Sequence, residues 1–186
     1  MNIFKYFLIS HMILATLTCT SLYTITLQKS KYKDLTNKVN VLLRLIIHIS
    51  FIYFCYKYKT ILFKYNDEYL LYLIAVLIIT IGYVVLSIFY FYKNNNYYIG
   101  SLILFIFAMI LFLIRTKFFN HNNSLHNTFY SYADCLIYLI AFILLLIYGF
   151  NGNYNLLFIG VIIDIIGRFI SIYICYQNFL DNESAK

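Results

Sequence analysis

Long apolar stretches separated by short polar segments dominate this chain. The charge-poor stretches cover approximately residues 6–28, 39–57, 69–92, 97–115, 129–150 and 154–177. About 20 apolar residues are enough for a helix to cross the hydrocarbon core of a bilayer. The runs are continuous, whereas strands of a transmembrane β-barrel alternate apolar and polar residues. The pattern therefore predicts an all-α fold, a polytopic transmembrane helical bundle of about six spans, as a single transmembrane domain over residues 1–186.

The first apolar stretch has two interpretations. Lys5 precedes an apolar core, and the small residues between Thr18 and Ser21 resemble a signal-peptide cleavage region. However, the apolar run continues to Leu27, whereas the hydrophobic region of a signal peptide spans only about 7–15 residues. A retained transmembrane helix is therefore the favoured prediction, and five spans would remain if this segment were cleaved.

Short connections between the later stretches predict helical hairpins. Asn94, Asn95 and Asn96 follow Lys93 between the third and fourth stretches, and Asn151-Gly152-Asn153 separates the fifth from the sixth. Turns this short bring consecutive helices side by side in antiparallel directions. A slight excess of Lys and Arg on the side of both termini favours cytosolic termini. We expect an integral, multi-pass membrane protein, with the plasma membrane or the endoplasmic reticulum and secretory pathway as the favoured locations.

Tyrosines cluster where the expected helices should meet the membrane surface. Tyrosine rings favour the interface between lipid and water, because one end of the ring is apolar and the other is polar. The sequence thus predicts an aromatic belt that contains Tyr53, Tyr56, Tyr58, Tyr69, Tyr72, Tyr90, Tyr92, Tyr97, Tyr98, Tyr130, Tyr132, Tyr173 and Tyr176.

Composition identifies lipid as the solvent for most of the chain. Hydrophobic residues make up 63% of the sequence and charged residues 11%, against about 25% charged residues in ordinary soluble domains. Proline and tryptophan are absent while tyrosine and phenylalanine are abundant, which points to an A/T-rich genome. The net charge of +7 is scattered over short loops. Because no basic face or stripe is visible, we expect the lipid bilayer and not nucleic acid as a partner.

The sequence contains no recognisable catalytic or metal-binding motif. No nucleophile–histidine–acid set, phosphate loop or glycine fingerprint is present. His121 and His126 lie in an Asn-rich loop without carboxylates or thiolates, so neither a metal nor a cofactor is expected. The chain is therefore predicted not to be an enzyme. The cysteines lack CxxC spacing and are predicted to pack inside the membrane helices: Cys19, Cys55, Cys135 and Cys175.

The last apolar stretch carries the strongest functional signal. Asp164 and Arg168 lie in its middle, where a charged residue costs about 2.5–3.5 kcal/mol on insertion scales. Asp164 precedes Arg168 by four residues, the favourable order for an intrahelical ion pair. One helical face holds Gly160, Asp164, Gly167, Arg168, Ser171 and Cys175. Small and polar residues favour close helix packing, which predicts a docking face toward the bundle or a partner. The alternative is that Asp164 lines an ion or proton path.

Three other intramembrane polar residues are secondary candidates. Arg44 and His48 share one face of the second stretch. Arg44 is near the expected start of its helix, so its side chain is expected to reach the headgroups, and His48 is expected to bond to a neighbouring helix. Asp134 is expected in the first turn of the fifth helix, where the helix dipole favours a carboxylate. The alternative for Asp134 is an ion pair with Arg44 or Arg168.

These features lead to two main functional hypotheses. The leading one is a non-catalytic accessory or regulatory subunit, or an assembly factor, of a larger membrane complex such as a transporter or cation ATPase. Its polar face would then dock against a larger integral membrane protein. The alternative is a small ion, proton or solute transporter or channel that uses Asp164. A lipid-modifying intramembrane enzyme ranks last, because no acid–base or nucleophilic set is visible.

Overall fold

A computed structural model describes residues 3–26, 32–119 and 125–184 of this chain, and the described residues form helices without strands. Six helices are long and apolar enough to cross a membrane. The predicted all-α bundle is confirmed, and the chain is a multi-pass membrane protein. The helices are α1 (Ile3–Thr26), α2 (Lys33–Lys57), α3 (Lys59–Leu62), α4 (Asn66–Tyr92), α5 (Asn95–Phe119), α6 (Leu125–Asn151) and α7 (Tyr154–Ser184).

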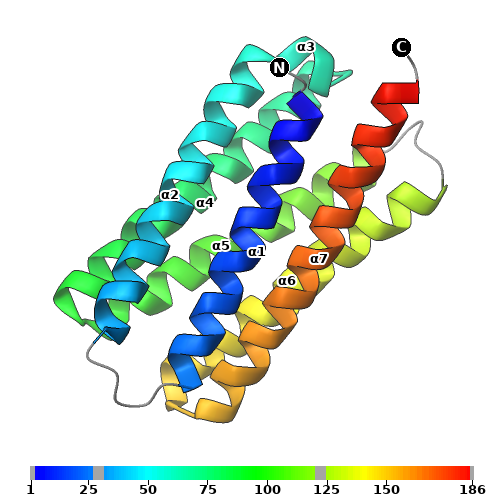
Figure 1. The fold of residues 1–186 in the computed structure, drawn as a ribbon. Coiled ribbons are helices and arrows are strands. Elements are labelled where there is room, and N and C mark those ends of the chain that lie inside the picture. The colour runs from blue at the N-terminus through cyan, green and yellow to red at the C-terminus, as the bar shows by residue number, and fades with distance from the viewer. Residues whose placement is uncertain (1–2, 27–31, 120–124, 185–186) are drawn as a thin grey trace.

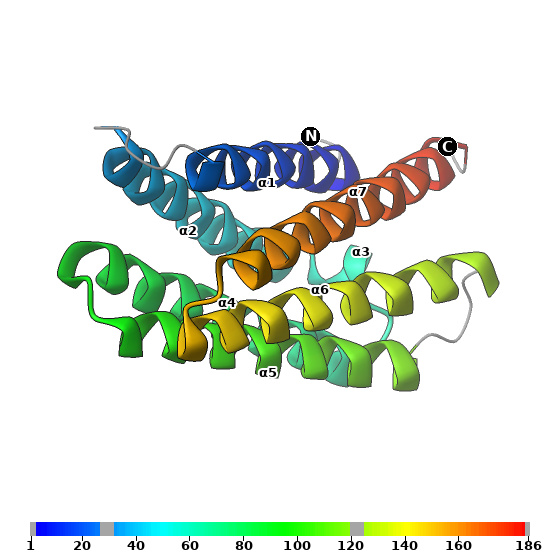
Figure 2. The same ribbon diagram turned by 90° about the horizontal axis from the view of Figure 1, so that it is seen from below.

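The six long helices form a closed ring in chain order (Figure 1). Each helix packs against its neighbours along the chain, and α7 returns to pack against α1. Figure 2 shows the same ring as two layers, with α1, α2 and α7 on one side and α4, α5 and α6 on the other. The first apolar segment is therefore a full member of the ring. Polar side chains on the inner faces of the helices are brought toward a common axis.

Both predicted hairpins are present, and each ends its first helix with a left-handed residue. Lys93 after α4 has φ 56°, and Gly152 after α6 has φ 68°. At the same end of the ring, Asn95 Nδ2 donates a hydrogen bond to the backbone oxygen of Gly149 at 2.6 Å. Lys93 also forms an ion pair with Asp34 at the start of α2. These contacts join the α4–α5 turn to the end of α6 and to the start of α2.

Large apolar side chains cover the outside of the ring. Ile46 on α2, Phe107 on α5 and Phe169 on α7 are 61%, 52% and 60% exposed. Inside, Phe105 and Phe142 belong to one apolar cluster that is shared by α2, α4, α5, α6 and α7. A water-soluble protein rarely exposes continuous apolar surface of this kind, so the outer surface is suited to lipid.

The four cysteines are free thiols. Cys55 and Cys135 are buried, as predicted, and Cys175 is half-buried. Cys19 is exposed, so the prediction that it packs among the helices is wrong. The neighbouring residue Thr18 is the one that is buried, in contact with Arg44 of α2.

Candidate functional site

The polar stripe of α7 faces the inside of the ring. Asp164, Arg168 and Ser171 are all buried. Asp164 Oδ1 lies 3.4 Å from Arg168 Nε, so the ion pair predicted from their spacing is present. The Arg168 guanidinium also lies over the ring of Tyr138, 4.8 Å from its centroid, a favourable cation–π position. The charged part of the stripe thus contacts helices of the same chain.

The glycines of the stripe allow α7 to approach α6 closely. A Cβ atom added at Gly160 would lie 2.9 Å from Cγ of Leu145 and 3.3 Å from the backbone oxygen of Ala141. A Cβ atom at Gly167 would lie 3.0 Å from the ring of Tyr138. Gly160 and Gly167 therefore serve the packing of α6 against α7 within this chain.

Arg44 joins the ion pair from across the ring. Its Nη1 atom lies 4.0 Å from Asp164 Oδ2. Its Nε atom donates to Asn40 Oδ1 at 2.8 Å and its Nη2 atom to Thr18 Oγ1 at 2.9 Å. Arg44 is only 8% exposed, so the prediction that it reaches the headgroups is wrong. The reason is that α2 begins at Lys33, which places Arg44 about three turns inside the helix.

The result is a chain of three charged side chains, Arg44, Asp164 and Arg168, which we call the central ion-pair chain. One carboxylate lies between two guanidinium groups, at 4.0 Å from one and 3.4 Å from the other. Two cations therefore share a single anion inside the ring. Such a cluster is costly in a membrane unless its charges are well compensated.

His48 forms its hydrogen bond within its own helix and not to a neighbouring one, contrary to the sequence-based expectation. Its Nδ1 atom lies 2.7 Å from the backbone oxygen of Arg44, so Nδ1 donates this hydrogen bond. The ring packs against Tyr83, with 4.7 Å between centroids, and against Phe51, at 5.5 Å. The contact of His48 with the neighbouring helix α4 is therefore aromatic.

Asp134 lies well inside α6, and neither of its predicted roles is observed. The helix begins at Leu125, so Asp134 is not in the first turn. No ion pair links it to Arg44 or Arg168 within the described residues. Instead, Ser171 Oγ donates to both carboxylate oxygens, at 2.9 and 3.0 Å. The prediction failed because α6 extends into a polar segment that the hydrophobic pattern did not assign to the helix.

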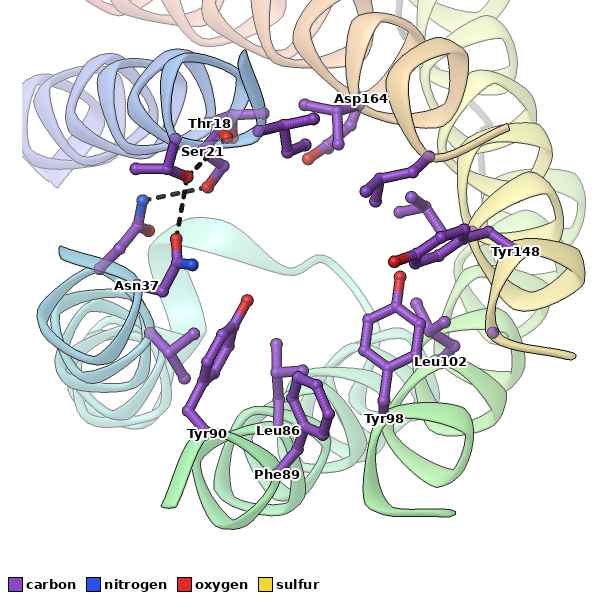
Figure 3. A pocket seen from close by; sticks show the side chains of 18 of the residues that line it. Thr18, Ser21, Asn37, Leu86, Phe89, Tyr90, Tyr98, Leu102, Tyr148 and Asp164 are labelled. Atoms are coloured by element: carbon purple, nitrogen blue, oxygen red, sulfur yellow. Dashed lines mark hydrogen bonds between the residues drawn. The ribbon is translucent and has the colours of Figure 1, made fainter. Parts of the chain in front are cut away.

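A first cavity of about 390 Å³ lies at the end of the ring where α4 meets α5 and α6 meets α7. All six long helices contribute to its wall, and Arg44 and Asp164 reach it from the central ion-pair chain. Figure 3 shows the Asp164 side chain directed into this space, with tyrosine side chains on the opposite wall. Tyr90 and Tyr98 line the cavity, and their place in an aromatic belt stays a prediction.

A second cavity of about 220 Å³ lies at the opposite end of the ring. Its lining includes Arg168, Asp134 and His11, again with contributions from all six long helices. Arg115 also lines it and pairs with Glu68, with Nη2 and Oε1 2.6 Å apart. The sequence offered no signal for this pair, because the two residues come from the ends of different helices.

Tyr83, Phe105 and Phe142 line the first cavity but not the second, and we call these three side chains the aromatic barrier. The ring centroids are 4.8 Å apart for Tyr83 and Phe105 and 5.2 Å apart for Phe105 and Phe142. A small space of about 50 Å³ touches this barrier and shares His48 and Arg168 with the second cavity. Both cavities therefore approach the central ion-pair chain along the axis of the ring.

Asn40 and Thr18 were not identified from the sequence as site residues. Asn40 precedes Arg44 by four residues, and this spacing on one helical face was an available signal. Thr18 belongs to another helix, and no pattern in the sequence indicates which helices become neighbours.

The described residues contain no group of three or more His, Cys, Asp or Glu side chains placed to hold a metal ion. His121 lies outside the residues that the structure describes, as does the side chain of His126. Comparison of this chain with protein-family models, with curated proteins and with solved structures found no match.

Proposed function

We propose that this chain is a small membrane transporter or channel in which a polar solute or ion moves along the ring axis past Asp164. The observation that carries this proposal is the pair of cavities that approach the central ion-pair chain from opposite ends. Buried charges inside membrane helices often mark solute and ion pathways, and transporters often bind substrate near the middle of the bilayer.

The first cavity has the size and chemistry of a binding site. Its volume of about 390 Å³ is within the usual range of small-molecule sites, about 300–1,000 Å³. Apolar and aromatic walls surround a few polar groups, among them Asn37, Tyr90 and Asp164. Arg44 and Arg168 share the carboxylate of Asp164. A solute that binds one guanidinium therefore changes the ion pair between Asp164 and the other. The proposed role needs no catalytic step.

The accessory-subunit hypothesis stays a prediction. It relied on the polar stripe of α7 as a docking face for a larger integral membrane protein. Asp164, Arg168 and Ser171 are buried within this chain, so the stripe no longer supports that role. Co-purification of a larger membrane protein in mild detergent would support it independently.

The test of transport is a flux measurement on purified protein in phosphatidylcholine vesicles. Stopped-flow light scattering would follow the entry of glycerol, glycine and acetate, and a pH-sensitive dye would follow protons. We expect the wild type to accelerate the entry of at least one of these solutes. Asp164→Asn should reduce that rate by about tenfold or more, the effect of roughly 1.4 kcal/mol, and Asp164→Glu should retain part of it.

Asp67→Asn is the matched control, because Asp67 is an exposed aspartate at the start of α4. Each variant must enter vesicles in equal amounts and keep its helical circular-dichroism spectrum. The transport proposal is wrong if the wild type moves neither protons nor any of these solutes under acid, neutral or alkaline conditions. Equal flux through wild type and Asp164→Asn would remove Asp164 from the mechanism.

A further inference from the structure

We propose that the second cavity is a binding site for an anionic group, a carboxylate or a phosphate, held by the guanidinium of Arg168. This site lies at the opposite end of the ring from the first cavity. The proposal does not depend on transport, because an anion can bind there whether or not a solute crosses the ring.

The Arg168 guanidinium has more hydrogen-bond donors than it has acceptors nearby. The side chain is 6% exposed, and a guanidinium carries five N–H donors. Across the described parts of the chain, Arg168 makes no hydrogen bond, and its Nε atom is fully buried. Its contacts are the ion pair with Asp164 and the cation–π contact with Tyr138. Buried N–H donors without a hydrogen-bond acceptor are destabilising, so an acceptor bound in this cavity would be stabilised by the N–H groups of Arg168.

Two further nitrogen atoms in the wall of the second cavity are also buried without a hydrogen-bond partner in the described residues. They are Nδ1 of His11 and Nε of Arg115. His11 comes from α1, Arg115 from α5 and Arg168 from α7, so three helices contribute nitrogen-bearing side chains to the wall of one cavity. Arginine forks match the geometry of carboxylate and phosphate oxygens.

The charges around the cavity favour an anion over a cation. Arg168 shares the carboxylate of Asp164 with Arg44, and Arg115 is paired with Glu68. Neither Asp164 nor Glu68 is among the residues that line the cavity. The charged side chains of the lining are those of Arg115, Arg168 and Asp134, and Asp134 accepts hydrogen bonds from Ser171. Two arginines against one aspartate give the wall of the cavity an excess of positive charge.

Binding is measured by isothermal titration of inorganic phosphate and of acetate, at constant ionic strength, into full-length protein in phosphatidylcholine nanodiscs. N-methylglucamine serves as the cationic control. We expect saturable binding of at least one anion and none of the cation. Loss of charge-assisted hydrogen bonds in Arg168→Gln should weaken binding by about tenfold to a hundredfold. Lys57→Gln removes an exposed charge and should leave the affinity unchanged.

Arg168→Gln leaves Asp164 with a single cation, so the double variant Asp164→Asn/Arg168→Gln is measured beside it. The double variant removes both charges of the ion pair together and avoids an unpaired buried charge on α7. It should also lose anion binding. Unchanged affinity in a folded double variant would overturn the assignment to Arg168, as would an equal loss of affinity in Lys57→Gln.

A second arm distinguishes a free anion from a lipid headgroup. Native mass spectrometry of protein extracted from membranes that contain phosphatidylglycerol would detect a retained anionic lipid. Binding of phosphate or acetate identifies a soluble anion. Retention of the lipid by the wild type but not by the double variant, without binding of soluble anions, identifies a headgroup phosphate. If neither arm detects an anion, the proposal is overturned, and this result is independent of the flux measured for the first cavity.

Discussion

Asp164 is the residue on which the charge balance of the ring depends. It lies within 4.0 Å of Arg44 and 3.4 Å of Arg168, and all three side chains are buried. Removal of either arginine leaves Asp164 with one cationic neighbour. Removal of Asp164 leaves two cations without a paired carboxylate. Loss of Asp164 is therefore expected to destabilise the ring more than loss of either arginine.

We expect Asp164→Leu to lower the free energy of unfolding by about 3–5 kcal/mol, the usual cost of breaking a buried ion pair from one side. Arg168→Leu should cost less, because Asp164 keeps Arg44. The double variant Asp164→Leu/Arg168→Leu should be more stable than Asp164→Leu alone. Thermal unfolding in a mild detergent would give this order. Equal losses for the two single variants would contradict the shared role of Asp164.

At the level of single residues, the sequence predicted only what lies on one helix. The Asp164–Arg168 pair follows from a spacing of four, which any straight helix places on one face. The Arg44–Asp164 contact depends on how α2 and α7 are rotated about their axes, and hydrophobicity alone does not specify that rotation. Asn40 and Thr18 were missed for the same reason, although both fix the Arg44 guanidinium.

The helices α6 and α7 pack closely at the glycines of the polar stripe. Their contact depends on Gly160, where an added Cβ atom would lie 2.9 Å from Leu145. Overpacking a tight contact typically costs about 1–3 kcal/mol. We expect Gly160→Val to destabilise the bundle by this amount, measured by thermal unfolding in detergent.

Gly100→Ala is the matched control for this contact, because its nearest neighbour would be Val85 Cγ1 at an ordinary 3.8 Å. The control should not lower the free energy of unfolding, because alanine favours a helix over glycine by up to about 1 kcal/mol. If Gly160→Val were as stable as Gly100→Ala, the glycines of the stripe would not be required for packing between α6 and α7.

The existence of each long helix was predictable, because each contains an apolar run that matches the thickness of a bilayer. The ends were less predictable, because polar residues extend a helix beyond its apolar core. The start of α2 at Lys33 and of α6 at Leu125 shows this. These extensions explain the two wrong predictions at Arg44 and Asp134, since both depended on the assumed start of a helix.

The whole molecule is a ring with an interior that the hydrophobic pattern did not reveal. Short turns identified the α4–α5 and α6–α7 hairpins, but nothing in the sequence indicated that α7 would return to α1. Tyr90 and Tyr98 were assigned to the membrane surface because they lie near helix ends, and nothing in the sequence indicated that they would line the first cavity. Lipid-facing and axis-facing positions differ only by rotation of a helix, which composition does not resolve.

If the two cavities open toward opposite sides of the membrane, water reaches each from one side only. Thiols react with membrane-impermeant maleimides as thiolates, which form in water and not in lipid. We expect Asn37→Cys, at the first cavity, and Ser131→Cys, at the second, to react from opposite sides of sealed vesicles. The background is a variant in which the four native cysteines are replaced by alanine.

Ile46→Cys is the control for this labelling, because Ile46 is 61% exposed on the outside of the ring and should face lipid without reacting. The charges of the loops favour cytosolic termini, so Ser131→Cys should react from the cytosolic side and Asn37→Cys from the other. Reaction of both from the same side would contradict two cavities with opposite openings and, with it, a path along the axis. Reaction of Ile46→Cys at the same rate would show that the outside of the ring is in contact with water.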